Sequence, residues 1–386
     1  MPLPRIALAH DYLNQYGGAE RVLEVFHDLY PEAPVYTSIY APDRMPESYR
    51  SWDIRASSMQ HLPGIHQHHQ PYLLLYPIAF QRFRFDAYDL VLSSSSAFVK
   101  GIRVPGNALH ICYCHSPMRF AWDFDHYAQR ERIGPAARRL LPPLLAWLRR
   151  WDVETTRGVS HFIVNSTAVA QRIQTYWGRS STVICPPVET AGARPVPPDE
   201  VGEYYLLVSR LVPYKRFDIA IDAFNALGLP LKIVGDGRAR AELERRAGPT
   251  IEFLGAVSDE EKYRLYARCR AAIFPAEDDF GIAQVEVQAA GRPAIALAAG
   301  GALDSVIDGV TGVHFQPQTA EALAQAARHA EGLTFSPETI VRNAERFSRP
   351  RFEREISKFV ADRIAEWRGR SDRSSRQLVE AATRWN

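Results

Sequence analysis

The sequence has almost no net charge, no long apolar segment and few cysteines, and each absence excludes a class of protein. Its 46 Lys and Arg residues nearly balance 44 Asp and Glu residues, so the formal net charge of +2 gives no argument for nucleic-acid binding. No apolar run reaches the roughly 18 residues of a membrane-spanning helix. The amino terminus lacks a signal-peptide cleavage site. We therefore expect a cytoplasmic protein without a nucleic-acid partner.

The four cysteines do not form the spacing of a disulfide framework or a zinc site. They are scattered along the chain, at Cys112, Cys114, Cys185 and Cys269. Cys112 and Cys114 alternate within an apolar strand pattern. This arrangement predicts buried free thiols.

The order of apolar segments predicts an α/β protein with two doubly wound parallel sheets that face each other across a cleft. The 386 residues, 46% of them hydrophobic, suffice for two domains. Strands and amphipathic helices alternate in both halves of the chain. The predicted strands cover residues 5–10, 34–39, 90–94, 108–114, 162–165 and 182–184, then 204–208, 231–234, 251–253, 271–274 and 293–297.

Changes in composition set the expected domain boundaries. Residues 1–185 form the first domain and residues 201–348 the second. An Ala-, Gly- and Pro-rich linker joins them at residues 186–200. A final helix is expected over residues 349–368. The remaining residues, 369–386, are rich in Arg, Ser and Asp and are expected to form a mobile tail.

The stretch 275–293 is the segment around which the rest of the chain is expected to be arranged. It reads as strand, carboxylate-rich loop and helix, with Glu277, Asp278 and Asp279 in the loop. A helix that starts after Phe280-Gly281 presents free N–H groups, which suit a phosphate. The carboxylates suit neutral hydroxyls instead. Together they predict a sugar nucleotide as ligand, although a surface acidic loop is the alternative.

Basic residues at another strand end supply the positive charge that this loop lacks. Arg210 and Lys215 lie between the first strand of the second half and the helix that follows. Arginine offers a planar fork for phosphate oxygens, and lysine a mobile point charge. We expect both to contact a diphosphate.

Two strand ends of the first half carry further candidates. Gly17 and Gly18 form a glycine turn after the first strand, where the backbone can approach a ligand closely. His115 follows the strand at 108–114, a position where α/β sheets place ligand contacts. Taken alone, the glycine turn is weak evidence, and a strand-end histidine that caps a loop is the favoured explanation of His115.

Taken in order, Gly17-Gly18-Ala19-Glu20, His115, Arg210-x4-Lys215 and Asp278-x7-Glu286 resemble the motifs of retaining glycosyltransferases of family GT4. The resemblance covers nearly the whole chain to about residue 367. It implies the two-domain architecture called GT-B, in which the last helix crosses back to the first domain. The family usually has glutamate as the first acid, where this chain has Asp278. Glu277 is the alternative, so the choice between the two carboxylates stays open.

The resemblance also implies roles for individual residues. His115 is expected to contact the donor sugar and Glu286 the ribose hydroxyls. Arg210 and Lys215 are expected to hold the leaving diphosphate. Backbone N–H groups are expected to assist them at Phe280, Gly281, Ile282 and Ala283. The loop containing Leu254 is expected to line the base pocket through its backbone.

The implied reaction moves a sugar from a nucleoside diphosphate to an acceptor with retention of configuration. In the front-face route proposed for this class, the departing phosphate oxygen accepts the proton of the acceptor. No base and no metal are then required. Asp123 and Asp125 match the Asp-x-Asp metal motif of a different glycosyltransferase fold, and we interpret the match as coincidence.

The sequence as a whole looks most like those of bacterial enzymes that build surface polysaccharide, many of which are mannosyltransferases. This suggests GDP-mannose as donor and a saccharide on a polyprenyl diphosphate as acceptor. A UDP-sugar donor is the near alternative, with glucose, N-acetylglucosamine or glucuronic acid. Two further classes are a sugar-nucleotide 2-epimerase and a non-catalytic sugar-nucleotide-binding protein.

Three features of the first half concern the acceptor and the membrane. The basic residues Arg82, Arg84, Lys100 and Arg103 could meet a phosphorylated or lipid-linked acceptor or form a solvated face. His61, His66, His68 and His69 lack a carboxylate or cysteine at ligand spacing, so a patch facing the acceptor is favoured over a metal site. The segment 136–151 combines arginines with leucine and tryptophan, which predicts contact with the inner face of the plasma membrane or a core-packing helix pair.

Overall fold

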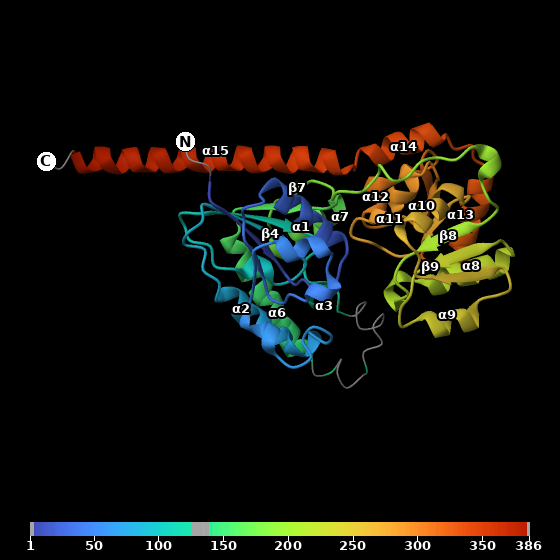
Figure 1. The fold of residues 1–386 in the computed structure, drawn as a ribbon, viewed down its shortest axis with the longest axis horizontal. Coiled ribbons are helices and arrows are strands. Elements are labelled where there is room, and N and C mark those ends of the chain that lie inside the picture. The colour runs from blue at the N-terminus through green and yellow to red at the C-terminus, as the bar shows by residue number, and fades with distance from the viewer. Residues whose placement is uncertain (1–3, 125–133, 135–138, 140, 384–386) are drawn as a thin grey trace.

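The computed structural model describes residues 4–124, 134, 139 and 141–383 of the chain. It has two lobes, each built on its own parallel sheet, and a long carboxyl-terminal helix that runs from the second lobe along the first (Figure 1). The predicted pair of doubly wound domains is therefore confirmed.

The first sheet has seven parallel strands in the order β3-β2-β1-β4-β5-β6-β7. Its central strands β4 and β5 are buried along their whole length, as expected for a parallel sheet covered on both faces. The short edge strand β3 was not predicted from the sequence. The strands are β1 Ile6–His10, β2 Val35–Thr37, β3 Ile54–Ala56, β4 Leu90–Ser95, β5 Leu109–Cys114, β6 His161–Val164 and β7 Thr182–Val183.

Helices and 3-10 turns connect these strands. The helices are α1 Gly18–Leu29, α2 Tyr76–Gln81, α3 Arg119–Trp122, α6 Pro142–Thr155 and α7 Thr167–Trp177. The irregular section between β2 and β5 contains the 3-10 turns η1 Pro42–Arg44, η2 Glu47–Ser51, η3 Ser58–His61, η4 Gln70–Leu75 and η5 Val99–Gly101. A further turn, η6 Thr156–Gly158, follows α6.

The second sheet has six parallel strands in the order β10-β9-β8-β11-β12-β13. They are β8 Tyr205–Val208, β9 Leu231–Val234, β10 Ile251–Gly255, β11 Ala272–Phe274, β12 Ala294–Leu297 and β13 Gly312–Phe315. The helices are α8 Phe217–Leu227, α9 Arg240–Arg246, α10 Asp259–Arg268, α11 Ile282–Ala289, α12 Ala302–Ser305, α13 Ala320–Glu331 and α14 Pro337–Glu345. Two 3-10 turns, η7 Pro198–Glu200 and η8 Pro213–Lys215, flank β8.

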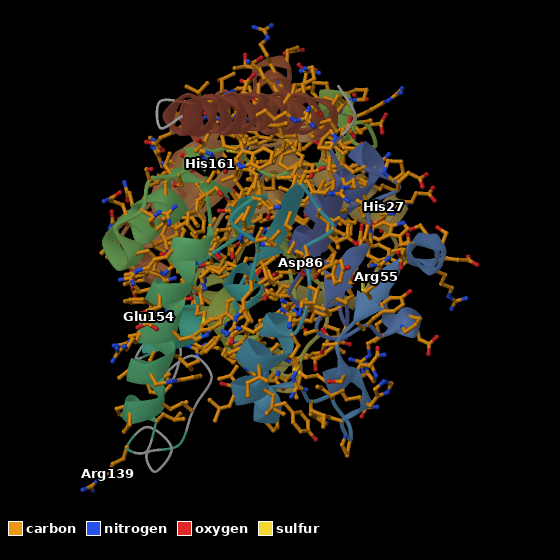
Figure 2. All side chains as sticks on the ribbon, turned by 90° about the vertical axis from the view of Figure 1, so that its left-hand side faces the viewer. His27, Arg55, Asp86, Arg139, Glu154 and His161 are labelled. Carbon is orange, nitrogen blue, oxygen red and sulfur yellow. The ribbon has the colours of Figure 1, made fainter. Side chains whose placement is uncertain are left out.

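The final helix, α15 Arg349–Thr383, belongs to the core of the first domain although it follows the second domain in the chain. Its side chains Phe352, Ile356 and Val360 are almost fully buried there. His161 lies beneath this helix in Figure 2, with its ring 6.2 Å from that of Phe359. The helix continues to Thr383, so it extends into the segment 369–386 for which a mobile tail was expected.

Lys100 does not lie on a basic surface, which corrects one expectation from the sequence. Its ammonium pairs with Asp152 of α6, and both side chains are almost fully buried. The indole N–H groups of Trp122 and Trp177 each donate to the other oxygen of Asp152 at 2.7 Å. Lys100 therefore anchors η5 to α6 and is closed to an acceptor. The four cysteines are buried and free, as predicted.

Candidate active site

A cleft of about 370 Å³ lies between the two domains at the carboxyl ends of their central strands. In each sheet the strand order reverses there, between β1 and β4 in the first domain and between β8 and β11 in the second. Such reversal points are where open α/β sheets bind ligands. Among the predicted residues, the cleft is lined by Gly18, His115, Lys215, Asp278, Phe280, Gly281, Ile282 and Ala283.

The acidic loop after β11 separates its carboxylates between the two domains. Asp278 lines the cleft, and its Oδ1 accepts a hydrogen bond of 2.6 Å from Nζ of Lys215. Glu277 instead pairs with Arg172 of α7 in the first domain and is not among the residues that line the cleft. The structure therefore brings Asp278, not Glu277, beside the predicted lysine.

Asp279, which sequence reasoning left without a role, joins the two domains. Its carboxylate pairs with both Arg119 of α3 and Arg172 of α7. Burial alone would raise the pKa of Asp279, but the two guanidinium groups outweigh burial and lower this pKa below its usual range. The loop carboxylate is thus ionised at neutral pH, and it holds the first domain against the acidic loop.

Glycines allow the acidic loop to pack closely against the turn that contains Gly301. Gly281, the residue before α11, has φ of +87°, a left-handed conformation that favours glycine. A Cβ at Gly301 would lie 2.2 Å from the Cα of Phe280, so no larger residue fits there. The N–H of Gly301 also donates to the carbonyl of Asp278 at 2.9 Å. The turn at Gly301 packs against the acidic loop and so fixes the start of α11 at the cleft.

The predicted basic pair is divided by the structure. Lys215 lines the cleft, whereas Arg210 is exposed and donates to the hydroxyl of Tyr214 at 3.4 Å. Ser209, the residue directly before Arg210, lines the cleft. Arg216, directly after Lys215, has φ of +53°, an uncommon conformation for a residue with a Cβ.

The glycine turn of the first domain meets the second domain. A Cβ on Gly18 would lie 2.7 Å from Cδ1 of Ile282, so a larger residue would require the Ile282 side chain to move. Gly17 precedes α1 and does not line the cleft. The glycine at position 18 therefore permits the close approach of α1 and α11.

His115 reaches the cleft from the end of β5. Its Nε2 lies 2.8 Å from Oγ of Ser94, and its carbonyl accepts from Nδ2 of Asn165 at 2.9 Å. Burial, with a smaller contribution from His10, lowers the pKa of His115 to about 3. The ring is therefore neutral at physiological pH, and it lines the cleft as a hydrogen-bonding group without a charge.

Glu286 and Leu254 lie beside the cleft and do not line it. The carboxylate of Glu286 is buried on α11, where Oε1 accepts from Arg21 of α1 at 3.0 Å and Oε2 lies 3.4 Å from the hydroxyl of Tyr266. Leu254, in β10, packs against the hydrophobic core of the second domain. The sequence placed both at the nucleotide, and their roles stay predictions.

The structure describes no group of three or more His, Cys, Asp or Glu side chains that could hold a metal ion within the ranges given above. In the histidine-rich segment, Nδ1 of His69 lies 3.0 Å from the hydroxyl of Tyr76, and the carbonyl of His66 accepts from Arg44. His61 and His68 are exposed. Asp125 of the Asp-x-Asp match lies outside the described residues.

Two family models match consecutive parts of the chain. Residues 16–191 match the model described as Glycosyltransferase Family 4, and residues 193–347 match that described as Glycosyl transferases group 1. The chain belongs to glycosyltransferase family 4. The boundary between the two models falls within the predicted linker.

Curated relatives match part of the chain. The O-antigen chain mannosyltransferase C of Escherichia coli is 33% identical over 177 residues, which are 44% of this chain and 46% of that protein. The D-rhamnosyltransferase WbpZ of Pseudomonas aeruginosa is 33% identical over 150 residues, 37% of this chain and 39% of the relative. The matched region thus spans less than half the length of each.

Solved structures of similar fold cover almost the whole chain. Anabaena Alr3699/HepE in complex with UDP has a TM-score of 0.70 and 20% identity, covering 93% of this chain and 100% of that one. The sucrose-phosphate synthase of Thermosynechococcus elongatus has a TM-score of 0.71 and 18% identity, covering 94% and 99%. These likenesses show the shared fold, and the predicted GT-B architecture of this family 4 chain is confirmed.

Sequence reasoning missed the residues that join the domains. Arg21, Arg119 and Arg172 reach carboxylates on the second domain that lie 105 to 265 residues away in the sequence. The third acid of the loop, Asp279, was the available signal, since a carboxylate left without a role suggests a basic partner. Nothing in the spacing of the arginines identified that partner.

Proposed function

We propose that the protein is a retaining glycosyltransferase that transfers a sugar from a nucleoside diphosphate to a saccharide acceptor. The observation that carries this proposal is that Lys215, Asp278 and the amino terminus of α11 lie together in one wall of the cleft. A cation and free helix N–H groups suit a diphosphate, and a carboxylate suits sugar hydroxyls. Membership of family 4 supports the same reaction class.

The proposed mechanism is electrostatic stabilisation of the leaving diphosphate. Nζ of Lys215 and the first N–H groups of α11 face the same cleft, so both can meet negative charge as it grows on the leaving oxygen. Arg210 would join them only after its side chain turns from solvent. In the front-face route, the leaving phosphate oxygen takes the proton of the acceptor hydroxyl, so the proposal requires neither a metal nor a protein base.

Asp278 and the neutral ring of His115 are proposed to hold the hydroxyls of the donor sugar. Both line the cleft from opposite domains, so a sugar bound between them would bridge the two sheets. Asp278 is the acid of choice because Glu277 is engaged by Arg172. Glu286 is proposed to hold the ribose through the oxygen that faces Tyr266.

GDP-mannose is the proposed donor, with a lipid-linked saccharide of surface-polysaccharide synthesis as acceptor. The mannosyltransferase relative supports this choice, and UDP-sugars are the alternative. Thermal-shift measurements with GDP, UDP and ADP test it, because a ligand that binds only the folded state raises the melting temperature. Stabilisation by GDP alone supports GDP-mannose as the donor, and stabilisation by UDP alone would indicate a UDP-sugar instead. Incubation of GDP-mannose with polyprenyl-diphosphate saccharides then has to give a product.

Peripheral membrane contact of the first domain belongs to the same proposal. None of the described helices has the length and apolar character to cross a bilayer. Segment 136–151 lies partly outside the described residues, at 136–138 and 140. Within α6, Leu145, Leu148 and Trp151 pack into the core, which favours the core-packing interpretation for that part.

The remaining candidates for the membrane are exposed side chains on two helical segments that both pack against η5. They are Leu74, Leu75 and Ile78 on η4 and α2, and Trp147 on α6. Arg139 projects beyond the end of α6 that lies farthest from α15 (Figure 2). Co-sedimentation with anionic phospholipid vesicles tests the contact. Trp147→Ser and Ile78→Ser should reduce binding, while Val310→Ser, equally exposed on the second domain, should leave it unchanged.

A further inference from the structure

A chain of hydrogen-bonding side chains leads from the first helix to His115 through the interior of the first domain. Oε1 of Glu20 lies 3.3 Å from Nε2 of His10, and Nδ1 of His10 lies 3.1 Å from Oγ of Ser94. Oγ of Ser94 lies 2.8 Å from Nε2 of His115. Glu20, His10 and Ser94 are all buried, so water does not compete for these contacts.

Three neighbouring strands hold this chain in place. His10 ends β1 and faces Ser94 as its register partner on β4. His115 directly follows β5, the next strand of the sheet. Glu20 lies in the first turn of α1 and reaches back to β1. Because the strand order reverses between β1 and β4, the side chains of Glu20, His10, Ser94 and His115 follow one another, each within hydrogen-bonding distance of the next.

The direction of the hydrogen bonds follows from the chemistry of the first group. An ionised carboxylate accepts and cannot donate, so Nε2 of His10 carries a hydrogen. In a neutral ring, Nδ1 of His10 is then an acceptor, and the single hydroxyl hydrogen of Ser94 points to it. The oxygen of Ser94 can consequently meet Nε2 of His115 only by accepting its hydrogen.

This direction decides which nitrogen of His115 is left for a ligand. Because the ring is neutral, a hydrogen on Nε2 leaves Nδ1 as a lone-pair acceptor. Nδ1 has no hydrogen-bond partner among the residues that the structure describes, and the side chain lines the cleft. We propose that Glu20, His10 and Ser94 are positioning residues that hold His115 in its Nε2–H tautomer, so that Nδ1 accepts a hydrogen bond from a hydroxyl of the donor sugar.

The identity of the ligand as a sugar hydroxyl rests on the proposed function, whereas the tautomer does not. A site of this kind selects a group that donates a hydrogen bond. Donor analogues in which the contacting hydroxyl is replaced by fluorine or methoxy would present only acceptors to Nδ1. Such analogues are expected to bind less tightly than the parent sugar nucleotide.

The tautomer can be measured without any substrate. Long-range proton–nitrogen correlation spectra of protein labelled with ¹⁵N-histidine distinguish a protonated ring nitrogen from an unprotonated one, and the His115→Asn spectrum assigns the signals. We expect His115 to be protonated at Nε2 at pH 7.5. If His10 were protonated on both ring nitrogens, its Nδ1 would donate to Ser94, and the hydroxyl of Ser94 would donate to Nε2 of His115. The hydrogen of His115 would then lie on Nδ1, and a signal of that form would overturn the proposal.

Variants of the chain test whether it sets the tautomer. Ser94→Ala removes the hydroxyl, and Glu20→Gln adds an amide that can donate to His10; both should give a mixture of tautomers at His115. Ser93→Ala is the matched control, because Ser93 lies next in β4 and its Oγ contacts the buried ring of His110 at 2.8 Å. An Nε2–H signal that persists unchanged in both test variants would contradict the proposal, and Glu20→Gln decides if Ser94→Ala does not fold.

Kinetics connect the tautomer with transfer. We expect Ser94→Ala to lower kcat/KM for the donor about tenfold, the size of one lost hydrogen bond, and Ser93→Ala to stay within about twofold. Equal losses in the two variants would show a structural effect and contradict the positioning role. If no sugar nucleotide supports transfer, the proposed function fails, while the spectra still decide the tautomer.

Discussion

Arg21 and Glu286 join the two domains through a hydrogen bond of 3.0 Å between a guanidinium nitrogen and Oε1. The pair links α1 with α11, and Oε2 of the same carboxylate lies 3.4 Å from the hydroxyl of Tyr266. Glu286 thus has one oxygen turned toward each domain. If it also binds the donor ribose, as proposed, then donor binding and domain contact depend on one carboxylate.

Replacing Glu286 by alanine should raise the KM for the donor by about tenfold or more, because a hydrogen bond to a charged group is lost. Arg21→Met removes the domain contact and keeps the carboxylate, so its effect on this KM should be smaller. Steady-state kinetics with varied donor measure both. Equal increases would show that Glu286 acts through domain contact alone, and the ribose assignment would be wrong.

Lys215→Ala should lower kcat by about 10²–10³-fold, the usual effect of removing one preorganised contact to a leaving group. The fold should persist, since Lys215 lies at the cleft and its loss leaves no buried charge without water. Initial rates at saturating donor and far-UV circular dichroism measure these outcomes. Lys232→Ala, which changes a lysine paired with Glu252 on neighbouring strands, is the control. An unchanged rate for Lys215→Ala would contradict the proposed role of Lys215 in stabilising the leaving diphosphate.

Asp278→Asn should lose most of the activity, by at least about tenfold, and Glu277→Gln much less. The reason is their placement: Asp278 contacts Lys215 in the cleft, and Glu277 contacts Arg172 across the domain boundary. Parallel kcat and KM measurements on the two variants compare them directly. The opposite ranking would return the role to Glu277.

Lys100→Met should destabilise the protein by about 3–5 kcal/mol, because Asp152 would keep a buried charge without its partner. Urea unfolding followed by tryptophan fluorescence measures the change. Arg103→Met, at an exposed position three residues later, should change the free energy of unfolding by less than about 0.5 kcal/mol. Similar values for the two variants would show that the Lys100 pair contributes little.

Stability should fall as the pH drops below about 6.5, because two buried histidines resist protonation in the folded state. Burial lowers the pKa of His110 to about 4 and that of His115 to about 3. In the unfolded chain both bind protons near their ordinary pKa of about 6.5, so acid favours unfolding. Each contributes a slope of at most about 1.4 kcal/mol per pH unit between pH 6.5 and its folded pKa.

Urea unfolding at pH 7.5, 6.5 and 5.5 measures this slope. His110→Gln should flatten it, whereas His68→Gln, at an exposed position, should not. A flat profile in the wild-type protein would show that the two rings take up protons without unfolding.

The sequence carried enough local information to predict most elements. The start of the helix Asp259–Arg268 is encoded locally, because Ser258 caps it by accepting from the N–H of Glu261 at 3.2 Å. The helix Thr167–Trp177 ends before Gly178, whose φ is +63°. The short edge strand β3 was missed, since three half-exposed residues carry almost no periodic signal.

The site was predictable only where its residues sit at strand ends. Gly18, His115, Lys215 and Asp278 meet in one cleft because the carboxyl ends of the two sheets face each other. The side-chain directions of Arg210 and Glu277 depend on neighbours from other elements, so spacing alone did not place them. The partners of Asp279 lie 160 and 107 residues away, and a single sequence contains no signal that links them.

Helix α15 makes the first domain depend on a segment that is translated after the second domain. Phe352, Ile356 and Val360 fill the core of the first domain, so this core stays incomplete until those residues have left the ribosome. The second domain has its own core and needs no later segment to form it. Order of synthesis and order of completion are therefore reversed, and the nascent chain exposes part of the apolar surface of the first domain while the second domain is being synthesised.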